Sequence, residues 1–330
     1  MAVLKTLDRN PADFGVKRES VEVSPQSLYW RFNYFMGKRI VLFVLTNLLI
    51  IVTLNIVMSV FGVRHYITAQ GMDYNALLVF CLIWGFGAAF ISLALSRVMA
   101  KWMMGVKVID PAAASGESRW LVDTVHGLAK KAGLTVMPEV GIYDSPEVNA
   151  FATGPSKKRS LVAVSAGLLS RMNKDQVEGV LSHEMAHVAN GDMVTMTLVQ
   201  GVVNAFVMFI ARAIAFAVSQ NVREESRMMV NFAVTLVLEI LLSILGMMVV
   251  AWFSRLREFR ADAGGAQLGG RDKMVGALQG LRSTLALAEE APNSAVSTLK
   301  ISSKPSGMRA LFATHPPLEE RIARLQAMQG

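Results

Sequence analysis

Two histidines and a glutamate form the clearest chemical pattern in the sequence, His183-Glu184-Met185-Ala186-His187. The residues around it favour a helix, and side chains four positions apart in a helix project from the same face. His183 and His187 can therefore share one metal ion, and we expect one Zn²⁺ per chain. Glu184 lies beside the ion rather than on it, where its carboxylate can accept a proton from water. The pattern predicts metal-dependent hydrolysis with Glu184 as the catalytic residue.

A catalytic zinc site needs a third protein ligand and one open position. Glu258 and Asp262 are four residues apart after an apolar run, so a helix presents both on one face. We expect Glu258 to be the third ligand and Asp262 to orient a ligating histidine through its other ring nitrogen. The alternative is a solvated acidic pair that balances neighbouring basic side chains, namely Arg255, Arg257 and Arg260.

The elements that must position these side chains are a helix over residues 174–190 and a small sheet. Asn173 and Gln176 can cap the start of this helix reciprocally, and Gly191 ends it. A further helix is predicted around residues 119–131, and the predicted strands cover residues 140–143, 149–152 and 161–164. This composition predicts an α+β domain, mostly helical with a small sheet.

Two further features near this domain have open interpretations. The strand residues Asn149, Ala150 and Phe151 either form the edge along which an extended peptide substrate pairs, or belong to an ordinary internal strand. His315 either stabilises the oxyanion of a tetrahedral intermediate or is a surface histidine.

The composition indicates a membrane protein. Hydrophobic residues make up 53% of the 330 residues and charged residues 18%, which excludes disordered and nucleic-acid-coating proteins. The single cysteine, Cys81, excludes an intrachain disulfide. Four apolar runs are each long enough to cross a bilayer as a helix, and they cover residues 40–61, 76–96, 193–218 and 228–253.

The distribution of basic residues predicts the topology. The net charge of +8 follows from the enrichment of Lys and Arg in cytoplasmic segments, so no nucleic-acid partner is expected. The cytoplasmic segments are the N-terminal extension, residues 1–39, and the two parts of the domain, residues 97–191 and 254–330. The external segments are a periplasmic loop, residues 62–75, and a short turn, residues 219–227. Because the last two runs form a hairpin, His187 and Glu258 return to the same side of the membrane.

Two charged residues fall inside this hairpin, Arg212 and Glu239. An unpaired charge at the centre of a membrane helix is costly. Three interpretations follow: the two residues pair with each other, the hairpin lines a wet cavity, or the hairpin does not fully cross the bilayer.

Five segments together resemble the HtpX family of bacterial membrane-bound zinc metalloproteases, gluzincins related to the CAAX prenyl proteases. These segments are His183-Glu184-x-x-His187, Asn190-Gly191-Asp192, Glu258-x-x-x-Asp262, Asn149-Ala150-Phe151 and Thr314-His315-Pro316-Pro317. The resemblance extends from about Lys38 to the C-terminus, and residues 1–39 depart from the family pattern.

The resemblance implies a zincin-like domain on a four-helix anchor in the bacterial inner membrane. It implies zinc on His183, His187 and Glu258, with Glu184 as general base and then proton donor. It also implies endopeptidase action on misfolded or damaged membrane proteins from the cytoplasmic side, in quality control and stress response, and self-cleavage. Its partners are then protein or peptide substrates and the lipid bilayer, and oligomerisation is possible.

Two alternatives remain open from the sequence. One is a processing protease for a specific membrane substrate, which needs a roomy intramembrane chamber that four short-looped helices hardly enclose. The other is a non-catalytic membrane protein with a structural zinc. An intact Glu184 argues against the second, because a structural site needs no base and closes its fourth position with a protein ligand.

Overall fold

The computed structural model describes residues 41, 44–45, 48–60, 66–68, 71–290 and 311–328, with the side chains of 285–290 left out. It divides into two compact units. The mixed unit contains the described residues of Leu95–Met193 and Arg255–Gly330, and the helical unit contains those of Val23–Ala94 and Val194–Ser254. The predicted N-terminal extension, residues 1–39, lies outside the described residues.

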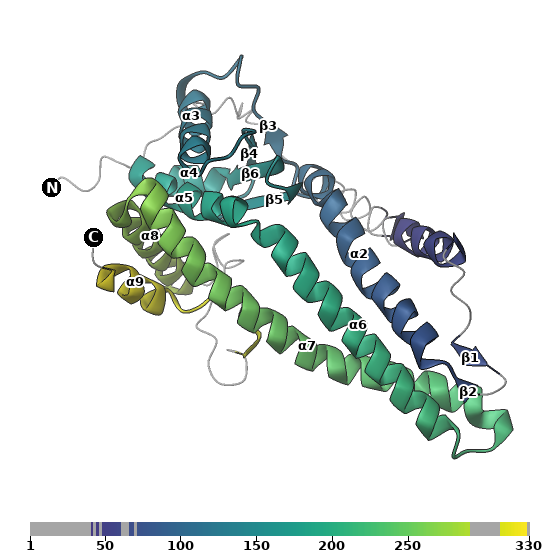
Figure 1. The fold of residues 1–330 in the computed structure, drawn as a ribbon. Helices are drawn as coiled ribbons and strands as arrows, with labels where there is room; N and C mark the ends of the chain where they lie inside the picture. The colour runs from purple at the N-terminus through teal and green to yellow at the C-terminus, as the bar shows by residue number, and fades with distance from the viewer. Residues whose placement is uncertain are drawn as a thin grey trace, which may run out of the picture. The chain divides into compact units, whose positions relative to one another are not determined.

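Three long apolar helices supply most of the helical unit: α2 (Tyr74–Met103), α6 (Asp192–Ser219) and α7 (Glu224–Gly269), drawn in Figure 1. Each is long and apolar enough to cross a membrane. They cover the predicted runs at residues 76–96, 193–218 and 228–253. The first predicted run, residues 40–61, is described only in part, with a shorter apolar helix over Leu48–Val60. Ahead of α2, β1 (Ile67–Thr68) and β2 (Gly71–Met72) form a short antiparallel hairpin.

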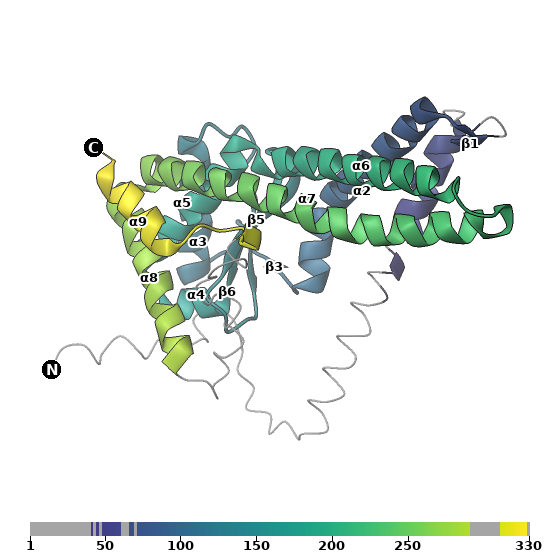
Figure 2. The same ribbon diagram turned by 90° about the horizontal axis from the view of Figure 1, so that it is seen from below.

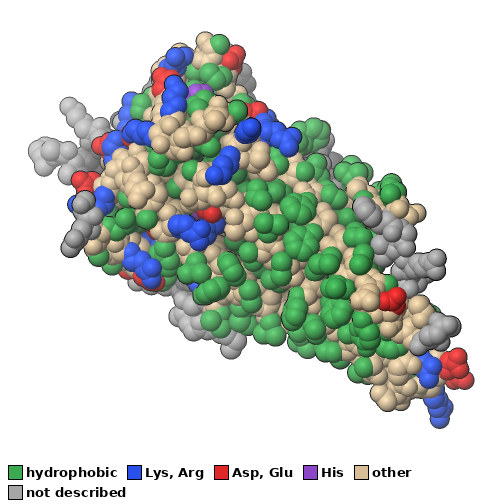
Figure 3. Space-filling model, viewed as in Figure 1, with side chains coloured by type: hydrophobic (Ala, Val, Ile, Leu, Met, Phe, Trp, Pro, Cys, Tyr) green, Lys and Arg blue, Asp and Glu red, His purple; other side chains and the backbone are tan. Residues whose placement is uncertain are grey.

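Apolar side chains remain exposed along these helices. In the most apolar window of α7 only 6% of the residues are buried, and Phe232 and Met228 on this helix are 70% and 86% exposed. Figure 3 shows hydrophobic side chains over much of this part of the surface, with few charged side chains among them. Such a surface is favourable in lipid and unfavourable in water, which agrees with a membrane protein.

Within the helical unit, small residues and one ion pair hold the helices together. A Cβ atom on Gly85 of α2 would lie 2.7 Å from the backbone nitrogen of Ala205 on α6, so these backbones approach closely. Arg212 on α6 forms an ion pair with Glu239 on α7. The guanidinium of Arg212 also lies 5.4 Å from the ring centroid of Phe80 on α2. Of the three interpretations of these charges, the structure shows the pair.

The mixed unit contains a four-stranded sheet whose strand order is β3-β4-β6-β5. Strands β4 and β6 pair in parallel, and the other pairs are antiparallel. Strand β5 is therefore an edge strand, with one side paired to β6. The strands are β3 (Lys107–Val108), β4 (Glu139–Tyr143), β5 (Ala150–Ser156) and β6 (Arg159–Ser165), which confirms the three predicted strands.

Helices pack around this sheet. Helix α5 contacts β5 and β6, and it also packs against α3 and α8 (Figure 2). The core between α3, α5 and the sheet includes Leu121, Val125, Val162, Leu181 and Met185. The helices of this unit are α3 (Gly116–Lys131), α4 (Ala166–Arg171), α5 (Lys174–Asn190), α8 (Arg271–Glu290) and α9 (Leu318–Ala327), together with the end of α7.

Helix α5 begins and ends at the predicted residues. The side chain of Asn173 accepts a hydrogen bond from the backbone N–H of Gln176, and the side chain of Gln176 accepts one from the backbone N–H of Asn173. Gly191 ends the helix with a φ of +73°, a left-handed conformation that favours glycine. The chain then continues directly into α6 at Asp192.

Candidate metal centre

Helix α5 presents two histidines on its buried face. His183 and His187 are 7% and 8% exposed, and their Nε2 atoms lie 3.1 Å apart. One helical turn separates them, so their side chains leave the helix in the same direction. Two imidazole nitrogens therefore face a common point.

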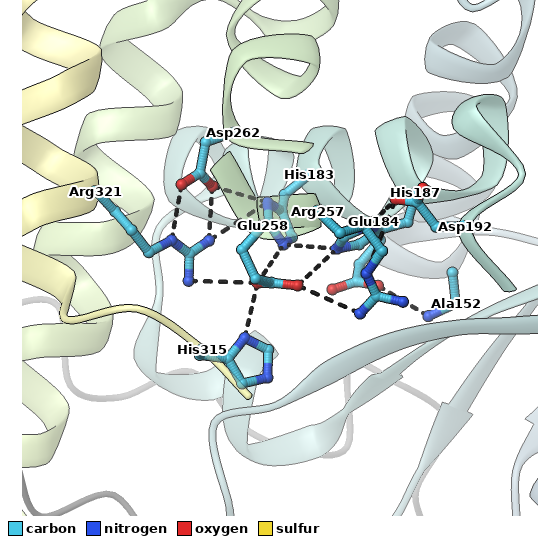
Figure 4. Close-up of polar contacts among 10 residues, drawn as sticks. All are labelled: Ala152, His183, Glu184, His187, Asp192, Arg257, Glu258, Asp262, His315 and Arg321. Carbon is cyan, nitrogen blue, oxygen red and sulfur yellow. Dashed lines mark hydrogen bonds and ion pairs between the residues drawn. The ribbon is translucent and has the colours of Figure 1, made fainter. Parts of the chain in front are cut away.

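Helix α7 adds a carboxylate to this point, as Figure 4 shows. Glu258 is fully buried, with Oε2 3.4 Å from Nε2 of His183 and Oε1 3.2 Å from Nε2 of His187. The three donor atoms lie within 4.8 Å of one another. The structure thus brings together the three residues that the sequence analysis assigned as metal ligands.

The spacing of these three groups fits a divalent cation. Tetrahedral ligands at zinc-to-ligand distances of about 2.1 Å are about 3.4 Å from one another. The distances of 3.1, 3.4 and 3.2 Å between the two imidazoles and the carboxylate are close to this value. Two imidazole nitrogens and one carboxylate form a donor set typical of catalytic zinc.

Each histidine has a second carboxylate on its other ring nitrogen. Nδ1 of His183 lies 2.9 Å from Oδ1 of Asp262, and Nδ1 of His187 lies 2.6 Å from Oδ2 of Asp192. A carboxylate at Nδ1 keeps the ring proton there and leaves the Nε2 lone pair available to a metal. The structure thus places Asp262 in contact with Nδ1 of His183, and its role in orienting this ring stays a prediction.

Two arginines balance the buried acids. Arg321 of α9 is 6% exposed and donates from Nη2 and Nε to Oδ1 and Oδ2 of Asp262, at 2.6 and 2.8 Å. Its Nη1 lies 3.7 Å from Glu258. Arg257 on α7 lies 3.4 Å from Glu258 and 4.0 Å from Asp192. The two guanidinium groups thus offset part of the negative charge of the three carboxylates, which are those of Asp192, Glu258 and Asp262.

The pKa values reflect this environment. Burial opposes a charge on His187, but the carboxylates of Asp192 and Glu258 outweigh it and raise its pKa to about 9. Burial likewise opposes ionisation of Glu258, but hydrogen bonds with His183, His187 and His315 hold its pKa well below the usual range. Without a metal the carboxylates thus favour a proton on His187, and a bound cation would displace this proton from the ligating nitrogen.

Glu184 lies on α5 outside the group of three ligand atoms. Its Oε2 accepts a hydrogen bond of 2.9 Å from the backbone N–H of Ala152 on β5. The backbone oxygen of Asn149 accepts from Ser165 of β6, so by alternation the backbone groups of Ala152 face away from β6. The free edge of β5 and the Glu184 carboxylate are thus adjacent, and Asn149, Ala150 and Phe151 lie at the start of this edge.

His315 reaches the same group from the segment before α9. Its Nδ1 lies 2.7 Å from Oε2 of Glu258, and its side chain is 65% exposed. The contact with Glu258 places it beside the candidate ligands, and the exposed ring is accessible to a substrate.

Sequence reasoning assigned no role to three residues of this site. Asp192 appeared only within a motif, Arg257 only as a neutralising neighbour, and Arg321 not at all. The position of Asp192 directly after the glycine that ends the histidine helix was an available signal. Arg321 is 138 residues from His183 in the chain, and its contact arises from tertiary packing.

Comparison with a solved structure supports the fold. The chain is similar to the crystal structure of S. mikatae Ste24p, with a TM-score of 0.61 and 18% sequence identity. The similarity covers 90% of this chain and 65% of the Ste24p chain, so the chain spans less than two thirds of that protein.

Sequence comparisons give the family. The model for peptidase family M48 matches residues 115–329. The chain is 56% identical over 298 residues to a Protease HtpX homolog of Bacillus velezensis, covering 88% of this chain and all of the relative. It is also 56% identical to that of Bacillus subtilis and 49% identical to that of Methylacidiphilum infernorum, again over 88% of this chain and 100% and 99% of theirs. The chain therefore belongs to peptidase family M48 and, within it, to the HtpX group of membrane metallopeptidases.

Proposed function

We propose that the chain is a membrane-bound zinc endopeptidase in which His183, His187 and Glu258 hold the metal and Glu184 is the catalytic base. The convergence of two imidazoles and one carboxylate, with Nε2 atoms 3.1 Å apart, carries this proposal. Asp262 orients His183 through the 2.9 Å contact at Nδ1. One zinc ion per chain fits this set of ligands.

The mechanism follows from what each side chain can do. Zinc, when bound, lowers the pKa of a water molecule and polarises the carbonyl of the scissile bond. Glu184 accepts the proton of the attacking water at its carboxylate and then donates it to the leaving amide nitrogen. Its hydrogen bond with Ala152 keeps the carboxylate between α5 and the strand edge, outside the ligand group.

The edge of β5 positions the substrate. An extended peptide adds to the free side of this strand, where backbone pairing tolerates many side-chain sequences. Asn149, Ala150 and Phe151 begin this edge, and Ala152 links it to Glu184. His315, whose ring is exposed beside Glu258, stabilises the oxyanion that forms at the scissile carbonyl.

The membrane topology that we propose gives the side on which the site acts, and the resemblance to the HtpX family implies the cellular role. Helix α6 and the apolar part of α7 separate His187 from Glu258 in the chain, and an even number of crossings returns both to one side. Basic residues follow the apolar part of α2, with Arg97, Lys101 and Lys107 close together in sequence, which favours the cytoplasmic side. We assign a zincin-like domain on four helices in the bacterial inner membrane, the first over residues 40–61. Its action is cleavage of misfolded or damaged membrane proteins in quality control.

Cleavage of an unfolded model protein by the full chain in detergent, with zinc added, tests the enzymatic part. Glu184→Gln is expected to lower the rate by at least about 10³-fold while metal content stays unchanged, because it removes the base and no ligand. Glu258→Gln is expected to lower both the rate and the metal content. The matched control is Glu178→Gln, on the same helix but paired with Lys273, and its rate should remain close to wild type. Full activity of the Glu184→Gln protein would overturn the assignment.

A further inference from the structure

Three consecutive basic residues form the tip of the β5–β6 hairpin. Lys157, Lys158 and Arg159 follow the end of β5 and are all exposed. Among the described residues, none forms an ion pair or a hydrogen bond with the side chain of any of the three, although the Ser160 hydroxyl donates to the backbone oxygen of Lys157. The site chemistry does not use them either, so their charge is available to a partner.

The tip lies beside the point where the chain enters its third long apolar run. A Cβ atom on Gly191 would lie 3.3 Å from Cε of Lys157. Gly191 ends α5, and α6 begins with Asp192 and continues as an apolar helix from Met193. Lys157 therefore lies beside the residue from which the chain enters α6, two residues before its apolar part begins.

Three other basic residues near the ends of the apolar helices have acidic partners. Arg97 and Lys101, near the end of α2, lie 2.5 and 2.7 Å from the carboxylate of Glu139. Arg257 lies 3.4 Å from Glu258. The hairpin tip instead gathers three consecutive charges for which the described residues provide no ion pair.

We propose that residues 157–159 bind the anionic lipid headgroups of the leaflet that α6 enters. The proposal rests on the assignment of α6 as a membrane-spanning helix, and it does not require the peptidase activity. Basic residues at the surface of an anionic leaflet are attracted to it over a Debye length of about 8 Å. Because β5 leads directly into the tip, this contact holds the substrate edge strand at the membrane surface, where a segment of a membrane protein leaves the bilayer.

The test measures the contact between the tip and the lipid directly. The full chain with Cys81→Ala and Ser156→Cys carries a fluorophore on the new cysteine, at the end of β5. It is reconstituted in phosphatidylcholine nanodiscs with or without phosphatidylglycerol, and both contain the same fraction of a lipid with a nitroxide on its headgroup. We expect quenching to be about twofold stronger with phosphatidylglycerol, and added salt to reduce the difference.

Two triple variants distinguish an effect of the charges at the tip from an effect of the total charge of the protein. Lys157→Gln, Lys158→Gln and Arg159→Gln together should abolish the dependence on phosphatidylglycerol. The control replaces Lys130, Arg171 and Arg282 by Gln, which removes the same charge from exposed positions on α3, α4 and α8. Lys131, next to Lys130, donates to the backbone oxygen of Leu268 near the end of α7, far along this helix from its apolar part. The control should therefore keep the full dependence.

The outcomes distinguish this proposal from the proposed enzymatic function. Quenching is also measured in the Glu184→Gln variant. Because quenching does not depend on cleavage, it should keep its dependence on phosphatidylglycerol in this variant. Equal quenching in both lipids, or unchanged quenching in the tip variant, would overturn the proposal. A third outcome would assign the tip to substrate binding instead. In that case quenching would not depend on the lipid, and the tip variant would fail to cleave an acidic peptide in detergent.

Discussion

Each histidine of the candidate centre contacts a carboxylate through its Nδ1 atom, and the two carboxylates lie on different helices. Asp262 holds His183 and is itself bound by two nitrogens of Arg321. Asp192 holds His187 at 2.6 Å from the first turn of α6. Each carboxylate fixes one imidazole, so metal affinity should depend on both.

Replacing Asp192 tests its role in positioning His187. Asp192→Ala removes the acceptor at Nδ1 of His187, so we expect the metal affinity to fall about 10- to 100-fold. Asp192→Asn keeps an acceptor, so its metal affinity should fall less. Competition for zinc with a coloured chelator measures this without any substrate. Asp123→Ala, an exposed partner of Arg119, is the control and should bind as wild type. Unchanged affinity of Asp192→Ala would show that the contact does not position the ligand.

Loss of the Arg321 guanidinium should lower the stability of the fold. Arg321→Met leaves the buried carboxylate of Asp262 without its cation, a change that typically costs about 3–5 kcal/mol. Thermal unfolding in detergent should show a clearly lower midpoint for the metal-free protein. The control is Arg324→Met, because Arg324 lies on the same helix but pairs with Glu320 at the surface. Equal midpoints for the two variants would contradict the expectation.

The candidate ligands and Asp262 were predictable from local spacing, whereas the roles of Asp192 and Arg321 were not. His183 and His187, like Glu258 and Asp262, are four apart, and helical geometry alone places each pair on one face. Asp192 reaches His187 only because Gly191 adopts a left-handed conformation between α5 and α6. The contact of Arg321 depends on the packing of α9 against α8 and has no local pattern.

At the scale of elements, strand β5 contacts Glu184 and, in the function that we propose, links substrate binding to the base. Its outer backbone groups belong to the free edge, and one of them, the N–H of Ala152, donates to Glu184. The predicted strand at residues 149–152 was correct in position, and its place at the edge required the strand order. Strand order depends on pairings between distant segments, which one sequence does not reveal.

A proline can remove this hydrogen bond without removing a bond to β6. Ala152→Pro deletes an N–H that faces away from β6, so we expect the sheet to form and cleavage to fall at least about tenfold. The peptide cleavage assay gives the rate, and circular dichroism checks folding. Ala152→Gly, which keeps the N–H, is the matched control and should stay active. Wild-type cleavage by Ala152→Pro would exclude this edge as part of the active site.

At the scale of the molecule, a metal ion would connect two helices that are far apart in sequence. His183 and His187 lie on α5, whereas Glu258 lies on α7 beyond the apolar hairpin. A ligand that binds only the folded state stabilises it by about 2.7 kcal/mol at a free concentration of 100 times Kd. Binding should therefore stabilise the fold independently of catalysis.

Metal removal should lower the unfolding temperature. Chelation of the loaded protein is expected to lower the midpoint by about 5–10 °C, and zinc should restore it. Mg²⁺, which prefers oxygen ligands, should not restore it. Glu258→Gln should show a much smaller zinc-dependent shift. An undiminished shift in this variant would place the zinc at other residues.

The ion pair inside the helical unit explains how two charges persist in an apolar hairpin. Arg212 and Glu239 pair between α6 and α7, and Arg212 also donates to the backbone oxygen of Met208. Leaving one charge unpaired at the centre of a membrane helix costs about 2.5–3.5 kcal/mol on insertion scales. The cost should therefore appear when one partner is removed and largely disappear when both are.

A double-mutant cycle measures this coupling. Arg212→Met and Glu239→Leu are each expected to lower the free energy of unfolding in mixed micelles by about 2 kcal/mol, and the double variant by less than either. Ser243→Leu, an exposed polar residue on the same helix, is the control and should change little. Additive losses would mean that each charge has its own partner or water, and that the hairpin lines a wet cavity. A coupling of the expected sign instead identifies the pair as the feature that allows the hairpin to cross lipid and return Glu258 to the side of His187.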